Sequence, residues 1–171
     1  MSVTGKMRLE RISPATERAA LAFLERAPYD NVFITYLLLH EFSAVTRAKV
    51  VVVLDADSAV RGVGYYGRQL AIAAEDEALD ALAEHAKRHR GDRMIIGPRA
   101  AVSEFWKRVA KWHAPPRLVR DRQLVMSLER GRLAPYERSV IVRHARIEEW
   151  TAVADSSARM IEQELDYDPR R

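Results

Sequence analysis

The side chains best suited to chemistry are few and scattered along this chain. His85 and His89 lie four residues apart in a predicted helix, and this spacing places two histidines on one helix face, as some metal sites require. Their order is not H-E-x-x-H, and no third ligand follows at a matching spacing. The chain has no cysteine, which excludes disulfides, thiolate ligands and cysteine nucleophiles. We therefore predict no metal site.

The sequence assigns no catalytic residue either. Ser103 and Ser127 have no histidine and acid at a spacing that suggests a hydrolase triad. Glu162 and Glu164 lie in a predicted amphipathic helix and are expected to be solvated charges. Tyr65 and Tyr66 end a predicted strand, with Arg68 in the turn that follows, and this group is a candidate lining for a cleft. The alternative is that one tyrosine packs in the core while its neighbour faces solvent.

Short β-branched runs and amphipathic stretches alternate through the first 128 residues. The run Lys49–Leu54 is almost continuously β-branched, which predicts a strand buried on both faces. Ser13-Pro14 has the form of a helix start, and Gly91-Asp92 the form of a helix end. The predicted strands are Met7–Ile12, Lys49–Leu54, Val60–Tyr66, Gln69–Ala74, Arg93–Ile96 and Leu118–Leu128. The predicted helices run from Pro14 to about Ala27, over Asn31–Phe42 and Glu75–Arg90, and from about Ala101 to Trp112.

A second strand and helix follow the linker Gly131–Glu137, which carries glycine and proline. Ser139–Arg143 alternates like a strand. An apolar stripe then recurs every three or four residues, formed by Ile147, Trp150, Val153, Ser157, Ile161 and Leu165. A strand and a helix alone cannot close a core, so this segment must pack on the preceding domain, pack on another chain, or belong to a longer protein.

Charge and hydropathy exclude several classes of partner. The formal charge is +4, but acidic and basic residues are interspersed, and no basic block argues for nucleic-acid binding. The apolar run Val32–Leu39 is too short to span a bilayer, and the first residues lack the apolar region of a signal peptide. We expect a cytoplasmic protein without nucleic-acid or membrane partners.

Hairpins and helical crossovers occur together in this order of elements, which predicts an α+β fold with a mixed, mostly antiparallel sheet flanked by helices. Both the order and several short motifs resemble the GNAT family of acyl-CoA-dependent N-acetyltransferases. The resemblance is to bacterial tandem proteins, in which a domain of uncharacterised function precedes a catalytic GNAT domain. Its motifs are Val60–Tyr66, Met94–Pro98 with Val102 and Trp106, Val119–Leu124, and Val142-Arg143 with Glu148-Glu149, Met160, Glu164-Leu165 and Asp168-Pro169.

The resemblance implies acetyl-CoA as the cofactor of the family and a glycine-rich loop that grips its pyrophosphate. Bare backbone amides at a helix start suit this task. At the corresponding place, Ala73–Glu77, the chain has no glycine and three successive acidic residues. We therefore expect no tight binding of acetyl-CoA. Arg99, in the turn after Gly97-Pro98, is a weak candidate for contact with a phosphate.

The same resemblance implies that the second helix lines the acceptor site, which makes Asn31 and Tyr36 substrate-cleft candidates beside Tyr65, Tyr66 and Arg68. We expect residues 1–133 to form a degenerate GNAT-like domain and residues 134–171 to form the linker and first strand–helix unit of a second GNAT domain. The first domain would support or regulate the catalytic half, with a second GNAT domain or another copy of the chain packed on the 147–165 helix. One alternative is a free-standing, non-enzymatic dimerisation or ligand-binding module of the same fold. Another is an active acetyltransferase with an atypical cofactor loop.

Overall fold

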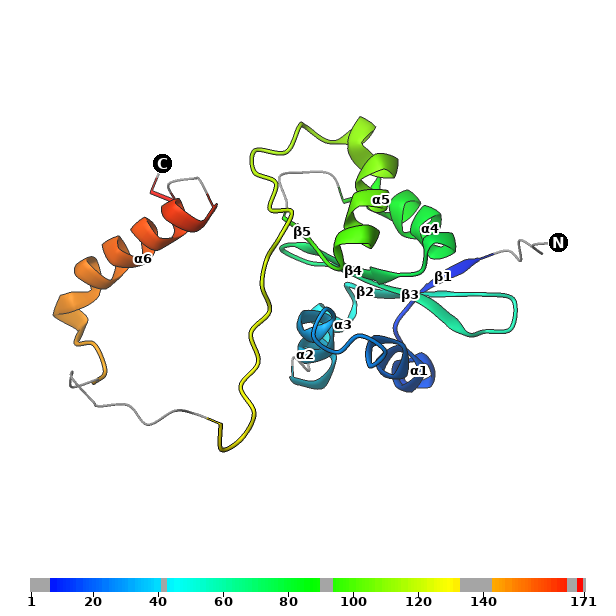
Figure 1. The fold of residues 1–171 in the computed structure, drawn as a ribbon, viewed down its shortest axis with the longest axis horizontal. Coiled ribbons are helices and arrows are strands. Elements are labelled where there is room, and N and C mark those ends of the chain that lie inside the picture. Colours follow the sequence, from blue (N-terminus) through cyan, green and yellow to red (C-terminus); the bar gives the residue numbers. More distant parts are fainter. Residues whose placement is uncertain (1–6, 41–42, 90–93, 133–142, 166–168, 171) are drawn as a thin grey trace. The chain divides into compact units, whose positions relative to one another are not determined.

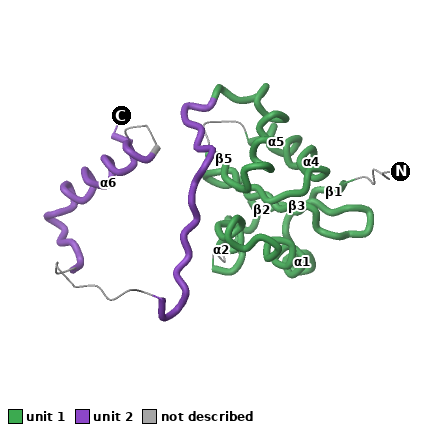
Figure 2. Tube along the Cα trace, viewed as in Figure 1, with its two compact units in different colours: residues 1–115 green, residues 116–171 purple. Residues whose placement is uncertain are grey.

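A computed structural model of the chain describes residues 7–40, 43–89, 94–132, 143–165 and 169–170. The chain divides into two compact units, Met1–Pro115 and Pro116–Arg171, which are coloured separately in Figure 2. The boundary predicted between residues 133 and 134 falls in the second unit, at residues that are not described. That domain assignment stays a prediction.

The first unit is built on a mixed sheet of five strands, in the order β1-β2-β3-β4-β5 (Figure 1). Neighbouring strands are antiparallel except β4 and β5, which run parallel. The parallel pair is joined through α4, as a crossover connection requires. The α+β class and the mostly antiparallel sheet predicted from the sequence are confirmed. The strands are β1 (Arg8–Arg11), β2 (Val50–Leu54), β3 (Val60–Tyr66), β4 (Leu70–Ala74) and β5 (Ile95–Ile96).

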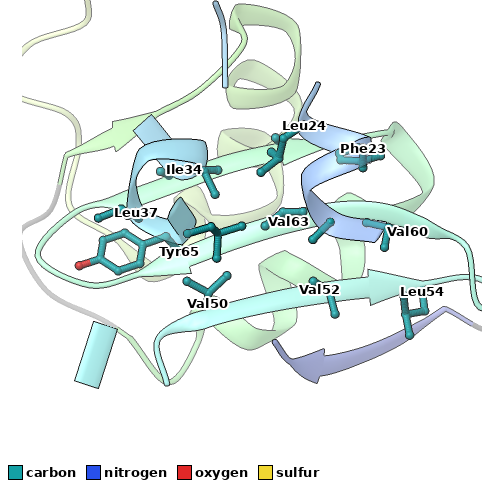
Figure 3. Packing of buried hydrophobic residues seen from close by; sticks show 14 residues of the cluster. Phe23, Leu24, Ile34, Leu37, Val50, Val52, Leu54, Val60, Val63 and Tyr65 are labelled. Carbon is teal, nitrogen blue, oxygen red and sulfur yellow. The ribbon is translucent and has the colours of Figure 1, made fainter. Parts of the chain in front are cut away.

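Two helices cover one face of this sheet. They are α1 (Pro14–Leu24) and α2 (Val32–His40), and a short helix, α3 (Ala44–Arg47), precedes β2. Phe23 and Leu24 from α1 and Ile34 and Leu37 from α2 pack against alternate residues of β2 and β3, as Figure 3 shows. Tyr65 belongs to this cluster.

The opposite face is covered by α4 (Asp76–Ala86) and α5 (Arg99–Val109), which continues as a 3-10 turn, η1 (Ala110–Trp112). Leu79, Leu82 and Phe105 are buried there against Val51 and Val53 of β2. Because Val50, Val52 and Leu54 face the other cluster, β2 is buried on both faces, as its β-branched run predicts.

The second unit contains one long helix, α6 (Trp150–Leu165), preceded by the 3-10 turn η2 (Ile147–Glu149). Glu149 holds the start of this helix, because its carboxylate accepts hydrogen bonds from the Arg143 guanidinium at 2.7 and 2.9 Å and from the Arg146 amide at 2.8 Å. The bond from Arg143, followed by the Arg146 amide, lowers the pKa of Glu149 to about 2. The helix predicted here is confirmed, whereas the strand Ser139–Arg143 lies almost wholly outside the described residues.

One expectation for this part of the chain is wrong. Leu118–Leu128 forms no strand: its backbone is irregular and every residue is exposed. Apolar and β-branched residues alone do not make a strand, because the backbone must also find a partner for its ladder. The apolar stripe of α6 is largely exposed, with the Trp150 side chain 64% exposed, and its packing on the preceding domain, on another chain or within a longer protein stays a prediction. Across the described residues, no helix is long and apolar enough to cross a membrane.

Candidate functional site

The predicted cofactor turn lies where the parallel strands β4 and β5 end. Carboxyl ends of parallel strands meet at one edge of a sheet, and this edge is a common place for ligands in folds with parallel sheets. Here the turn after β4 leads into α4 at Glu75, and the turn after β5 leads into α5 at Gly97-Pro98. The structure therefore brings the Ala73–Glu77 turn and Arg99 to the same edge.

Glu75 is held at this edge by two arginines. One carboxylate oxygen accepts a hydrogen bond from Arg26 Nη1 at 2.8 Å, and the other accepts from Arg61 Nη1 at 3.1 Å. Arg26 follows α1 and Arg61 lies on β3, so the Glu75 carboxylate links elements that are distant in sequence through these two hydrogen bonds. A carboxylate bound by two guanidinium groups is oriented and charge-balanced.

The network continues through Arg61 to the hairpin between β2 and β3. Arg61 Nε donates to Asp55 Oδ2 at 2.7 Å, and Asp55 Oδ1 accepts from the amides of Asp57 and Ala59, each at 2.9 Å. The hydrogen bond from Arg61, followed by the Ala59 amide, lowers the pKa of Asp55 below its ordinary value. Asp55, Arg61 and Glu75 together fix the hairpin to the start of α4.

The turn offers little to an incoming phosphate. The Glu75 amide donates to the Arg61 carbonyl at 2.9 Å, and the Ala78 amide donates to the Glu75 carbonyl at 3.0 Å. Asp76 is paired with Arg108 of α5 at 3.1 Å. Glu75 and Asp76 therefore repel an anion less than the sequence implies, because arginines balance their charges. The same arginines are already paired with these carboxylates.

Arg99 stands apart from that network. It is the first residue of α5, its side chain is exposed, and it forms no ion pair within the described residues. Its predicted phosphate contact stays a prediction: Arg99 lies at the sheet edge, but Pro98 beside it has no N–H to offer a phosphate.

The structure separates the two tyrosines proposed to share a cleft. Tyr65 packs on the α2 side, with its ring 6.0 Å from that of Phe33 in an edge-on contact. Tyr66 packs on the α4 side, and its hydroxyl donates to the Leu82 carbonyl at 2.6 Å. Both side chains are buried, because helices cover both faces of the sheet, so the expectation that one of them faces solvent is wrong. Burial raises the pKa of Tyr66, which leaves its hydroxyl a hydrogen-bond donor and not a base.

The remaining cleft candidates are also dispersed. Asn31 is buried at the start of α2, where its Nδ2 donates to the Leu24 carbonyl at 2.9 Å, and its Oδ1 has no partner within the described chain. Tyr36 is half exposed on α2, with its ring 5.0 Å from that of His40. Arg68 is exposed in the turn between β3 and β4. Asn31 has a structural role, since it joins the end of α1 to α2.

A groove of about 340 Å³ between α4 and α5 was not predicted from the sequence. Two of its lining cations are paired: Arg108 with Asp80 of the groove at 2.7 Å, and Lys107 with Glu104, which does not line it, at 2.5 Å. The Trp112 ring contacts two ammonium groups, 4.7 Å from Lys87 and 4.9 Å from Lys111. The groove lining contains no nucleophile or general base activated by a neighbour. Among the residues that the structure describes, no three histidine, aspartate or glutamate side chains gather to hold a metal.

The ion pair between Arg26 and Glu75 was not predicted from the sequence. The two residues are 49 positions apart, and one arginine among many carries no signal of its partner. The short Asp55–Arg61 pair was the only part of the network with a local signature, since a hairpin places its two ends side by side.

The fold and this edge define an α+β domain in which a five-stranded mixed sheet is covered on both faces and the crossover turn is closed by ion pairs. Residues 50–153, more than half of the chain, match the family described as Domain of unknown function (DUF4081), and the chain belongs to that family. The match begins with β2 and ends within α6, so it includes parts of both units. No curated protein and no solved structure matches the chain significantly.

Proposed function

We propose that the first unit is a GNAT-like domain that does not bind acetyl-CoA tightly and that supports or regulates an N-acetyltransferase activity carried elsewhere. The element order supports this proposal. An antiparallel meander β2-β3-β4 is followed by a helical crossover to the parallel strand β5, and the helices α1 and α2 and the short helix α3 precede the meander. This is the arrangement that the GNAT resemblance implies.

The absence of tight acetyl-CoA binding is inferred from the contacts of the turn at Glu75. In GNAT enzymes the corresponding turn presents glycine amides to a pyrophosphate. In this chain the Glu75 carboxylate stands at the turn, and it is held by Arg26 at 2.8 Å and Arg61 at 3.1 Å. The Glu75 amide of the turn and the Ala78 amide just beyond it already donate to backbone carbonyls. A pyrophosphate would have to displace these bonds and lie beside a fixed carboxylate, which is unfavourable.

Isothermal titration of the full chain with acetyl-CoA tests the proposal. We expect a dissociation constant no tighter than about 1 mM, which corresponds to a binding free energy of only about 4 kcal/mol. The Glu75→Gly variant is the informative partner, since it removes the carboxylate, frees Arg26 and leaves Arg61 paired with Asp55 alone. Micromolar binding by the unmodified chain would overturn the proposal and favour an active acetyltransferase with an atypical loop.

A second candidate function, a dimerisation module, is favoured by the exposed stripe on α6. Ile147 is 77% exposed and Val153 is 49% exposed, and with Trp150 they line a groove of about 480 Å³. A contiguous apolar surface of this kind is typical of a contact with another domain or another copy. Helices of this amphipathic pattern bury such a face when they associate.

Light scattering coupled to size-exclusion chromatography distinguishes the dimer. If a second copy covers the stripe, we expect about twice the 19.5 kDa chain mass, and Trp150→Ala should shift the protein toward the monomer at micromolar concentration. Glu148→Ala, an exposed residue of the adjoining turn η2, is the control and should leave the mass unchanged. A monomer at all concentrations would exclude the dimerisation module and leave another domain as the partner.

A further inference from the structure

Three aromatic rings meet at the far end of β3, away from the Glu75 turn. Tyr66 closes β3, and its ring lies edge-on to His85 at 4.6 Å and tilted against His89 at 5.1 Å. The two imidazoles are 5.0 Å apart. Because Tyr66 is buried and its hydroxyl is bound to the Leu82 carbonyl, its ring is a fixed floor below the two histidines.

Two arginines without ion pairs accompany these rings. Arg11, on the edge strand β1, pairs with Val51, whose side chain belongs to the cluster under α4. Directly paired residues of an antiparallel ladder project to the same face, so Arg11 lies on the side of His85. Arg88 follows the end of α4. Both guanidinium groups are exposed, and neither forms an ion pair within the described residues.

The charge around His85 is therefore positive. Burial is the largest cause that lowers the pKa of His85, and the charges of His89, Arg88 and Arg11 lower it further. Glu84, the adjacent carboxylate on α4, is paired with Lys87. Within the described chain, no carboxylate is paired with either arginine of this group.

We infer that Arg11, His85 and Arg88 form a binding site for the phosphate group of a small ligand, with the Tyr66 ring as its floor. Guanidinium and imidazole N–H groups are donors suited to phosphate oxygens, and the two guanidinium groups contain no acceptor. A metal ion is disfavoured at the same place, since two fixed cations would repel it and a third ligand is absent from the described residues. The site is independent of the proposed function, because it lies at the opposite end of β3 from Glu75.

Binding at this site is linked to the proton of His85. Protonation of His85 adds a third positive charge beside Arg11 and Arg88, and that repulsion disfavours the charged imidazole. A bound dianion offsets the repulsion, so it should raise the pKa of His85. By reciprocity, the anion should bind more tightly as the pH falls from about 8 to 5.

The experiment is an NMR titration of the histidine imidazoles in the full chain, with sodium sulfate as the probe. Sulfate is a tetrahedral dianion that does not itself titrate in this range, unlike phosphate. We expect the pKa of His85 to rise in sulfate more than in sodium chloride of equal ionic strength. His144, which lies in the second unit, serves as the internal reference and should respond equally to both salts.

Matched arginine variants complete the test. Arg11→Gln and Arg88→Gln should each weaken sulfate binding by about two- to fivefold, the size expected for an exposed charge pair. Arg18→Gln is the control, because Arg18 is an exposed arginine of α1, on the other face of the sheet, and it also has no ion pair within the described residues. An equal response of His85 to the two salts, or equal loss of binding in Arg18→Gln, would overturn the inference. Neither result depends on acetyl-CoA binding.

Discussion

Phe105→Ala is expected to lower the free energy of unfolding of the first unit by about 3–5 kcal/mol. The Phe105 side chain is fully buried between α5 and the sheet, in the cluster with Leu79 and Leu82. Truncation removes the apolar surface of a whole ring and leaves a cavity that close-packed neighbours fill only in part. Urea denaturation followed by the fluorescence of Trp106 and Trp112 measures the change.

Two further variants bracket this result. Phe105→Leu keeps most of the apolar volume and should cost less than half as much, which retains a measurable transition if the alanine variant does not fold. Trp150→Ala removes a larger side chain, but one that is 64% exposed. It should change the free energy of unfolding of the first unit by less than about 0.5 kcal/mol. If Phe105→Ala lowered the free energy of unfolding no more than Trp150→Ala does, α5 could not be packed on the sheet through a buried Phe105.

The elements of the first unit were predictable because each is bounded by residues with strong local preferences. The strand Val60–Tyr66 has the same limits in the sequence analysis and in the structure, since turn residues flank it on both sides. The helix α1 begins at Pro14 after Ser13, as the proline and serine indicate. The short helix α3 was missed. It spans only four residues, and its start depends on the Ser43 hydroxyl, which accepts a hydrogen bond from the Thr46 amide at 3.1 Å.

Side-chain partners were far less predictable than elements. Period-2 alternation predicts that Tyr65 and Tyr66 point to opposite faces, and they do, but it does not reveal that helices cover both faces. The extended segment Leu118–Leu128 shows the opposite error. Its apolar and β-branched residues suit a strand, yet the pairing that would make it one is a property of the fold and not of the segment.

At the candidate site, too, local features were predictable from the sequence and side-chain partners were not. The absence of glycine at Ala73–Glu77 is visible in the sequence, and it predicts the loss of an amide cradle. The arginines that balance the acidic residues come from the turn after α1, from β3 and from α5, and their convergence on Glu75 and Asp76 depends on the packing of those elements. Chemistry that rests on a missing residue type can therefore be predicted, whereas chemistry that rests on convergence requires the fold.

Gly97→Ala is expected to destabilise the first unit by about 3 kcal/mol, because the turn after β5 passes close to the backbone of β4 at this glycine. A Cβ at residue 97 would lie 2.3 Å from the Ile72 carbonyl oxygen and 3.2 Å from Ile72 Cγ1. The contact is with backbone, so no side-chain rotation relieves it. The turn must move away, and the parallel pairing of Ala71 with Ile96 is then lost. Thermal unfolding followed by circular dichroism should show a lower midpoint.

Gly131→Ala is the matched control for this prediction. It makes the same chemical change at a glycine with positive φ, 81°, but no atom lies within 4 Å of the added Cβ, and the residue belongs to the second unit. The transition of the first unit should therefore be unchanged. If the two glycine variants unfolded alike, steric exclusion at Ile72 could not be the cause. A loss confined to Gly97→Ala would instead establish that the carboxyl ends of β4 and β5, where the Glu75 network lies, are held together by backbone contact too close to admit a side chain.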